Sequence, residues 1–142
     1  MGTVAVGGII EKEGKFLLMQ EAQEACRGKW SIPAGLVDPG ENIFESAVRE
    51  IKEEAGYDVK LTGILEIGNR IDPEPFLGII FSTELIKKNN YYDEEEVLDI
   101  KWYTYEELLN MKDELRSYDW IINSIKAYKE NKIIDLDLIK LI

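Results

Sequence analysis

Residues 35–57 read GLVDPGENIFESAVREIKEEAGY and contain the clearest helix signal in the chain. The pattern predicts a helix from about Ile43 to Ala55. Asn42 is well placed to cap its N-terminus, and Glu45, three residues later, completes a near capping box. Gly56 suits the C-terminal stop, where a residue in the left-handed conformation is common. This short segment therefore carries its own start and stop signals.

The predicted helix has an apolar face and an acidic flank. With about 100° of rotation per residue, Glu50, Glu53 and Glu54 fall together on that flank. The apolar residues fall on one stripe that suits contact with a core: Phe44, Ala47, Val48, Ile51 and Ala55. Three carboxylates are thus crowded together beside a surface that is expected to be buried.

This crowding is unfavourable for the helix itself. Like charges three and four residues apart cost roughly 0.2–0.5 kcal/mol per pair, and the helix dipole disfavours negative charge near the C-terminus. Lys52 points elsewhere. Arg49 can reach Glu53 and Glu45, one turn away, which answers only part of the repulsion. A bound cation would relieve it, and clustered oxygen ligands suit Mg²⁺ or Mn²⁺.

An acidic helix flank taken alone is more typical of a solvated surface, so the residues upstream carry weight. Gly35 and Gly40 let the backbone turn tightly and approach a ligand closely, and Asp-Pro-Gly at 38–40 is a strong turn sequence. Glu41 follows the turn and can fold back toward the helix. Each feature alone fits an ordinary turn, but together they favour a ligand site.

The spacing of these residues resembles the Nudix box, G-x5-E-x7-R-E-U-x-E-E-x-G-U, in which U is a bulky aliphatic residue. Tyr57 departs from the pattern because it is aromatic at the last U position, and Ala34 stands where many members have a second glycine. The matching positions are Gly35, Glu41, Arg49, Glu50, Glu53, Glu54 and Gly56. The resemblance implies an α/β protein with the Nudix fold, a mixed β-sheet sandwiched between α-helices, formed by a single Nudix hydrolase domain over residues 1–142.

The resemblance also implies an activity. Nudix hydrolases cut a diphosphate linkage in a small nucleotide-like substrate by attack of water on phosphorus, with Mg²⁺ or Mn²⁺ bound. By this resemblance Glu50, Glu53 and Glu54 would hold the metal, and the carbonyl group of Gly35 would be a further ligand. Arg49 and Glu41 would support the geometry of these ligands.

The general base stays open at this stage. Glu50 is one candidate, but in other family members the base comes from a loop outside the box. Here an acidic run could supply it, although such a run also fits a solvated loop: Asp93, Glu94, Glu95 and Glu96. Because the chain has no histidine, carboxylates, water or lysine must do the acid–base work.

Two substrate classes are compatible with the sequence. Pro73 stands where ADP-ribose-cleaving relatives carry a proline, which favours a nucleoside diphosphate derivative similar to ADP-ribose, although it also fits a loop proline. The alternative is a (d)NTP pyrophosphatase that clears oxidised or non-standard nucleotides. Several aromatic residues could stack on a base, although aromatics at strand positions are more typical of a core: Trp30, Phe76, Tyr91, Tyr92 and Trp102.

Two functions outside catalysis are also compatible with parts of the sequence. A non-catalytic, nucleotide-binding regulatory domain would be expected to have lost box carboxylates, yet all are present. A structural interaction domain that uses residues 134–138 explains the tail but not the box. The apolar tail and the habit of the family make a homodimer a candidate assembly.

The remaining sequence alternates between predicted strands and helices. Thr3–Ile10 and Lys15–Gln20 predict a β-hairpin with a Gly-containing turn, and Glu21–Lys29 predicts a loop. Residues 134–138 alternate between apolar and acidic, which suits a strand that pairs with the sheet edge or with another subunit. Further strands are predicted at Asp58–Ile67, Phe76–Leu85 and Val97–Tyr103, and further helices at Tyr105–Met111 and Tyr118–Glu130.

The overall composition limits partners and location. Lys and Arg total 17 against 28 Asp and Glu, a formal charge of −11, which disfavours nucleic-acid polymers but permits a small phosphate ester if cations lie between. No apolar run approaches the roughly 20 residues that a membrane helix requires, and residues 1–10 lack the basic start of a signal peptide. With Cys26 as the only cysteine, no internal disulfide can form, which fits a cytoplasmic location.

Overall fold

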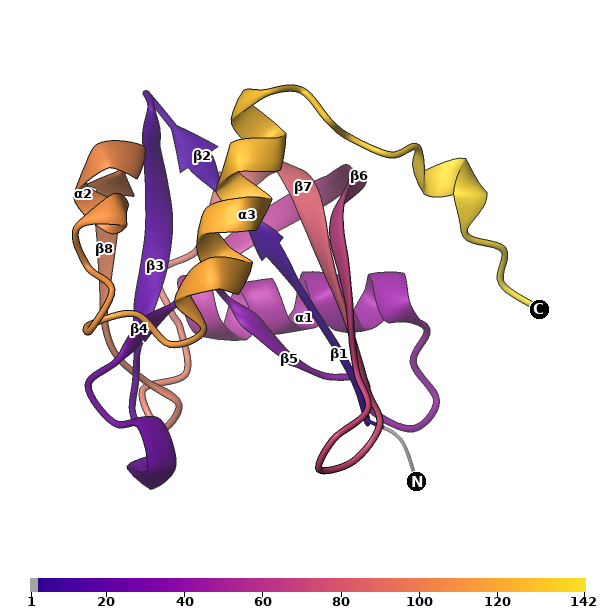
Figure 1. Ribbon diagram of the computed structural model, residues 1–142, viewed down its shortest axis with the longest axis horizontal. Coiled ribbons are helices and arrows are strands. Elements are labelled where there is room, and N and C mark those ends of the chain that lie inside the picture. Colours follow the sequence, from indigo (N-terminus) through magenta and orange to yellow (C-terminus); the bar gives the residue numbers. More distant parts are fainter. Residues whose placement is uncertain (1–2) are drawn as a thin grey trace.

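The computed structural model describes residues 3–142 and arranges them in two β-sheets with helices around them (Figure 1). Met1 and Gly2, the first two residues of the predicted domain, lie outside the described residues. The first sheet has the order β5-β1-β7-β6 and is mixed, because β1 and β7 run parallel while its other neighbours are antiparallel. Its strands are β1 (Thr3–Ile9), β5 (Ala34–Leu36), β6 (Tyr57–Arg70) and β7 (Phe76–Lys88).

The second sheet is antiparallel and smaller. Its strands are β2 (Glu11–Lys12), β3 (Lys15–Glu21), β4 (Trp30–Ser31) and β8 (Val97–Thr104). Strand β3 lies at its centre and pairs with β2, β4 and β8. The two sheets lie side by side in Figure 1, with β3 on the left and β1, β6 and β7 on the right.

The predicted hairpin between Thr3–Ile10 and Lys15–Gln20 is wrong. The first strand instead joins the other sheet, where β1 pairs along its whole length with β7 and also with β5. Burial explains this choice, because Val6 faces one core and Ile9 faces the other, and parallel strands are typically covered on both faces. The hairpin that does form is shorter and joins β2 to β3.

Three α-helices complete the fold of residues 3–142: α1 (Ile43–Ala55), α2 (Tyr105–Leu109) and α3 (Tyr118–Lys129). The bounds predicted for α1 are confirmed. Helix α1 packs through Ile51 on the face of the first sheet that carries Ile79, whereas α3 packs through Ile121 and Ile125 on the face that carries Ile80. The first sheet is therefore sandwiched between helices, as expected. None of the helices within residues 3–142 is long and apolar enough to cross a membrane.

The C-terminal tail does not form the predicted strand over residues 134–138. Only Ile134 pairs with the free edge of β6, through a single antiparallel bridge to Ile64. The side chain of Asp135 then accepts a hydrogen bond from the backbone N–H of Asp137 at 2.8 Å, a local turn that competes with strand pairing. A 3₁₀ turn, η2 (Leu136–Leu138), follows. A second short 3₁₀ helix, η1 (Glu24–Cys26), lies within the predicted loop Glu21–Lys29.

Candidate active site

Local interactions fix the start and the end of α1 and so set the direction of its carboxylates. Asn42 Oδ1 accepts from the N–H of Glu45 at 2.9 Å, and Glu45 Oε1 accepts from the N–H of Asn42 at 3.0 Å. This is the predicted capping box. At the other end Gly56 adopts φ 74° and its N–H donates to the carbonyl of Lys52. Both ends of the helix are therefore fixed, and so is the direction in which its acidic flank points.

Gly35 provides the space that this flank needs. It lies in β5 opposite Val6 of β1, and a Cβ at this position would overlap the carboxyl group of Glu50. Since its φ lies outside the left-handed range, whereas the turn residue Gly40 has φ 88°, the two glycines serve different purposes. Gly40 makes a turn that other residues rarely adopt, and Gly35 lets a carboxylate approach the backbone closely.

Arg49 is the central ionic contact of the site. Its Nε donates to Glu41 at 2.9 and 3.0 Å, and its Nη1 donates to Glu50 at 2.9 Å and to Glu53 at 3.2 Å. Its Nη2 forms an ion pair with Asp38 at 3.2 Å. Hydrogen bonds from Arg49 and from a serine hold the pKa of Glu41 below its usual value. The expected contact with Glu45 is not made, because that carboxylate caps the helix instead.

Glu54 is the buried member of the acidic flank, with 5% of its surface exposed. Its Oε1 accepts from the backbone N–H of Ala34 at 2.8 Å. Burial raises the pKa of Glu54 to about 9, and the negative charges of Glu50, Glu21 and Glu96 act in the same direction. Without a cation this carboxyl group is therefore protonated near pH 7, and a cation bound beside it would favour its charged form.

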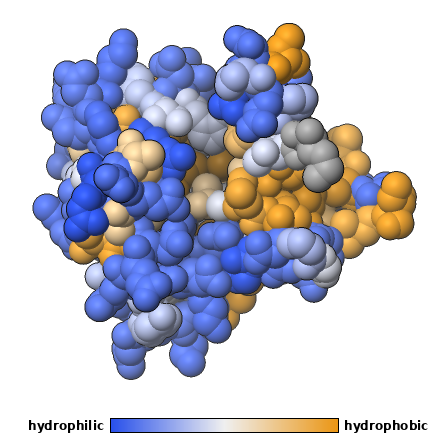
Figure 2. All heavy atoms as spheres, turned by 90° about the horizontal axis from the view of Figure 1, so that it is seen from below, coloured by the Kyte–Doolittle hydropathy of each residue, from blue (hydrophilic) through white to orange (hydrophobic). Residues whose placement is uncertain are grey.

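These groups line a cavity of about 950 Å³ that extends between the two sheets, within the size range of small-molecule sites. Figure 2 shows a hollow near the middle of one face of the molecule, with hydrophilic surface on one side and an apolar patch on the other. The predicted site residues that line the cavity are Gly35, Arg49, Glu50, Glu53, Glu54 and Glu96.

The other predicted residues lie outside the cavity. Glu41 acts on it only through Arg49. Glu94 and Glu95 are exposed, whereas Glu96 is half-buried and lines the cavity. The backbone N–H of Asp93 donates to the carbonyl of Glu53 at 2.7 Å. This bond fastens the acidic loop to the end of α1 and thereby brings Glu96 to the same cavity.

Most of the aromatic residues considered as base-stacking groups belong elsewhere. Trp30 is buried and contacts the ring of Tyr103 edge-on, with 5.5 Å between ring centroids. Trp102 packs in the same manner against Tyr57, and Tyr91 is exposed. Phe76 alone among the predicted aromatics lines the cavity. The preference of aromatics for the core accounts for these placements.

Trp120 of α3 also lines the cavity and was missed by the sequence analysis. Its ring lies against Gly68 and Gly78, which face each other across β6 and β7, and a Cβ on either glycine would overlap it. Helix α3 is held there by Ser124, whose hydroxyl donates to Glu66 at 2.6 Å. The signal available in the sequence was the pair of glycines within strands, which indicates close approach of another group.

Arg116 and Glu21 are two further cavity residues that sequence reasoning missed. They form an ion pair of 3.0 Å between Nη1 and Oε2, although 95 positions separate them in the chain. Nothing in the local sequence around either residue indicates this pairing.

The donor set fits a divalent cation in its chemistry. All the candidate groups are oxygen donors, the set that Mg²⁺ and Mn²⁺ prefer, and Glu54 places a buried carboxyl group in the wall, whose charged form a cation would favour. Within residues 3–142 no three acidic side chains are already grouped as metal ligands, and Arg49 engages both Glu50 and Glu53. The guanidinium group engages one oxygen of each carboxylate, Oε1 of Glu50 and Oε2 of Glu53, so the second oxygen of each would be the one offered to a cation.

Comparison with known proteins places this chain in a family. Residues 1–123 match the NUDIX domain model. The chain is 35% identical over 102 residues to the human 8-oxo-dGDP phosphatase NUDT18, a match that covers 70% of this chain and 31% of the human protein. It is 38% identical over 86 residues to the ADP-ribose pyrophosphatase of Methanocaldococcus jannaschii, covering 58% of this chain and 51% of that protein. The chain belongs to the NUDIX domain family, which confirms the resemblance of residues 35–57.

The fold comparison agrees. A solved NUDIX hydrolase from Nitrosomonas europaea matches with a TM-score of 0.90, covering 100% of this chain and 98% of that chain at 23% sequence identity. At this identity the likeness concerns the fold. The chain spans about a third to a half of the length of the first curated relatives that it matches.

The Arg49 network generates a first prediction. Arg49→Lys keeps one positive charge but replaces a fork of donors with a single ammonium group, which cannot hold Glu41, Glu50 and Glu53 at once. We expect turnover to fall about 10- to 100-fold, the range for groups that orient ligands, with an unchanged circular dichroism spectrum. Arg27→Lys, at an exposed arginine that donates to the carbonyl of Ala22, is the matched control. Equal activity of the two variants would show that the network is dispensable.

Proposed function

We propose that this chain is a Mg²⁺-dependent hydrolase that cuts the diphosphate linkage of a small nucleotide-like substrate by attack of water on phosphorus. The observation that carries the proposal is the buried carboxylate of Glu54, which lies in the wall of the cavity beside Glu50 and Glu53. Such crowding is unfavourable without a cation and useful with one, since a cation can bridge carboxylates to substrate phosphates.

Each residue of the box has a distinct task in this proposal. Glu50, Glu53 and Glu54 hold Mg²⁺, or Mn²⁺, together with the carbonyl group of Gly35. The bound ion supplies neutralisation of phosphate charge and activation of a water nucleophile. Arg49 keeps Glu50 and Glu53 at the cavity wall through its Nη1, and the N–H of Ala34 keeps Glu54 turned inward.

Glu41 is a positioning residue. It accepts two hydrogen bonds from Nε of Arg49 and a third, at 2.8 Å, from the hydroxyl of Ser46. These contacts fix the plane of the guanidinium group from outside the cavity, so Nη1 stays directed at Glu50 and Glu53.

Glu96 is the proposed general base, with Glu50 as the alternative on α1. A base must accept the proton of the attacking water within the cavity. Of the acidic loop residues proposed for this role, Glu96 is the one whose side chain reaches the cavity wall. Gln23 donates to its Oε2 at 3.2 Å, which orients the carboxylate.

The proposed substrate is a nucleoside diphosphate derivative. One relative is named for ADP-ribose and another for 8-oxo-dGDP, so both a sugar-linked diphosphate and an oxidised nucleotide are candidates. Pro73, which favoured the first, is exposed in the loop between β6 and β7 and lies outside the cavity lining. Chromatographic analysis of the products from ADP-ribose, 8-oxo-dGDP and the common nucleoside triphosphates, with Mg²⁺ present, distinguishes the classes. ADP-ribose would give AMP and ribose 5-phosphate, 8-oxo-dGDP would give the monophosphate and phosphate, and a triphosphate would give the monophosphate and pyrophosphate. Tight binding without any hydrolysis would instead favour a regulatory domain.

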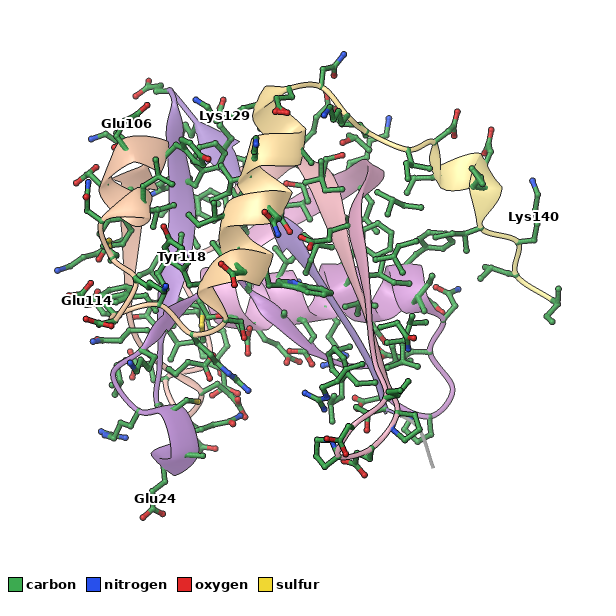
Figure 3. All side chains as sticks on the ribbon, in the orientation of Figure 1. Glu24, Glu106, Glu114, Tyr118, Lys129 and Lys140 are labelled. Atoms are coloured by element: carbon green, nitrogen blue, oxygen red, sulfur yellow. The ribbon has the colours of Figure 1, made fainter. Side chains whose placement is uncertain are left out.

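Removal of single box carboxylates tests the proposed metal site. Glu53→Gln and Glu54→Gln each keep the shape of the side chain, and the amide oxygen at position 54 can still accept from Ala34. We expect both variants to fold and to lose turnover at saturating Mg²⁺, because an amide is a much poorer ligand than a carboxylate. Glu106→Gln, on α2 at a distance from the cavity (Figure 3), is the control. Wild-type rates from either box variant refute the assignment.

Replacement of the loop carboxylates tests the proposed base. We expect Glu96→Gln to lower kcat about 100-fold or more, the usual contribution of a positioned base, while KM changes little. Glu94→Gln and Glu95→Gln alter exposed neighbours in the same loop and should leave kcat unchanged. If Glu96→Gln retains the wild-type kcat, the proton is taken by another group, and Glu50 becomes the next residue to substitute.

A further inference from the structure

Arg116 is held in the cavity by its backbone as well as by its side chain. Its N–H donates to the carbonyl of Trp30 at 2.8 Å, and the N–H of Trp30 donates to the carbonyl of Glu114 at the same distance. The segment that joins α2 to α3 is thereby fastened to β4, which it crosses in Figure 1. Glu114, in this segment, and Tyr118, the first residue of α3, are labelled in Figure 3 and flank Arg116 in the sequence. The position of Arg116 is therefore fixed by the fold.

The side chain of Arg116 rests on a buried anchor. Its partner Glu21, on β3, has a side chain that is 7% exposed, whereas the side chain of Arg116 is 51% exposed. Cys26 Sγ donates to the same oxygen of Glu21 at 3.1 Å. In the described part of the chain the guanidinium group contacts protein through Nη1 alone. Within residues 3–142 the other N–H donors of its fork make no hydrogen bond, and Arg116 lines the cavity.

The acidic lining of the cavity makes the unused donors of Arg116 significant. Three arginines line the cavity, Arg49, Arg70 and Arg116. They are outnumbered by the acidic residues of the lining: Glu21, Asp38, Glu50, Glu53, Glu54, Glu66 and Glu96. Arg49 uses all three of its nitrogens on protein oxygens, and Arg70 stacks on the ring of Phe76. A phosphate that enters this acidic cavity needs a cationic partner in addition to any metal, and Arg116 is the arginine that is both anchored and open.

The cavity also differs from end to end. The part of the lining from β6, β7 and α3 includes the apolar side chains of Phe76, Ile80 and Trp120, with Trp120 against the paired glycines, and offers aromatic surface for a nucleoside. The part formed by the second sheet and the segment after α2 carries Glu21 and Arg116. The carboxylates of α1 contact β5, at the other edge of the first sheet from β6, and the charge of Glu21 acts on Glu54.

We propose that Arg116 binds the terminal phosphate of the substrate, so that the cavity prefers nucleoside diphosphates and triphosphates to diphosphates that end in a neutral sugar. This inference rests on the proposed function, and it names the substrate class within it. A guanidinium fork matches the geometry of a phosphate group and can form two hydrogen bonds to it. Glu21 is a positioning residue that acts through Arg116.

The test compares ADP with ADP-ribose, which share the adenosine diphosphate part and differ in the terminal group. Affinities of their non-hydrolysable α,β-methylene analogues are measured by calorimetry, and KM and kcat are measured for the substrates themselves. We expect Arg116→Gln to weaken binding of the ADP analogue and to raise the KM for ADP at least tenfold. The values for the ADP-ribose compounds should change less than twofold. Arg116→Lys should fall between, since it keeps the charge and loses the fork.

Further variants separate binding from folding. Arg116→Gln leaves a buried carboxylate unpaired, which can destabilise the chain, whereas the double variant Glu21→Gln/Arg116→Gln removes both charges and should show the same selective loss. Glu21→Gln alone keeps the guanidinium and should cause a smaller loss. Arg27→Gln is the matched surface control and should leave the ratio of the two affinities unchanged.

The outcomes distinguish this inference from the function on which it rests. If Arg116→Gln and the double variant weaken both analogues equally, or neither, Arg116 does not read the terminal phosphate. Failure of the wild-type protein to bind the ADP analogue also overturns the inference. If the wild-type protein binds the analogue but hydrolyses no member of the panel, the proposed function fails while the affinity ratio still decides the role of Arg116.

Discussion

A single guanidinium group joins the turn before α1 to the acidic flank of that helix. Arg49 contacts Asp38 and Glu41 from the turn and Glu50 and Glu53 from the helix. It contributes one positive charge to four negative ones, so it can order these side chains without neutralising them. The remaining charge, together with buried Glu54, is the reason that the site calls for a cation. Lysines among these glutamates would have removed the repulsion and stabilised the helix, but the chain has acidic residues at these positions.

The two sheets and α3 form the walls of the cavity around this acidic flank. Strand β5 brings Gly35 against Glu50, and Ala34 against Glu54. The first sheet alone would leave these carboxylates at its edge. The second sheet and α3 close the space from the other side and supply Glu21, Arg116 and Trp120. The proposed metal site thus depends on one contiguous segment, whereas the proposed base and the shape of the binding cavity depend on contacts between distant parts of the chain.

This difference explains what could be predicted from the sequence. The bounds of α1, its capping box and its stop at Gly56 follow from local signals within residues 42–56, and the structure confirms them. The pairing of Arg116 with Glu21 has no local signal, and the glycines at 68 and 78 indicate that a group approaches these strands closely without indicating that it is Trp120. The hairpin prediction is wrong for the same reason. The turn at Gly14 is a local feature and is present, whereas the partner of β1 depends on burial of both faces of that strand. The strand expected in the tail was lost to a turn made by Asp135.

The most direct test of the account is a titration of the purified protein with Mn²⁺, followed by electron paramagnetic resonance of the free ion. The account predicts at least one bound ion per chain in the wild-type protein, in competition with Mg²⁺, and an affinity at least tenfold weaker in the double variant Glu53→Gln/Glu54→Gln. Mn²⁺ that stays free in the presence of the wild-type protein, with or without nucleotide, would contradict the account. Binding that is unchanged in the double variant would place the ion elsewhere.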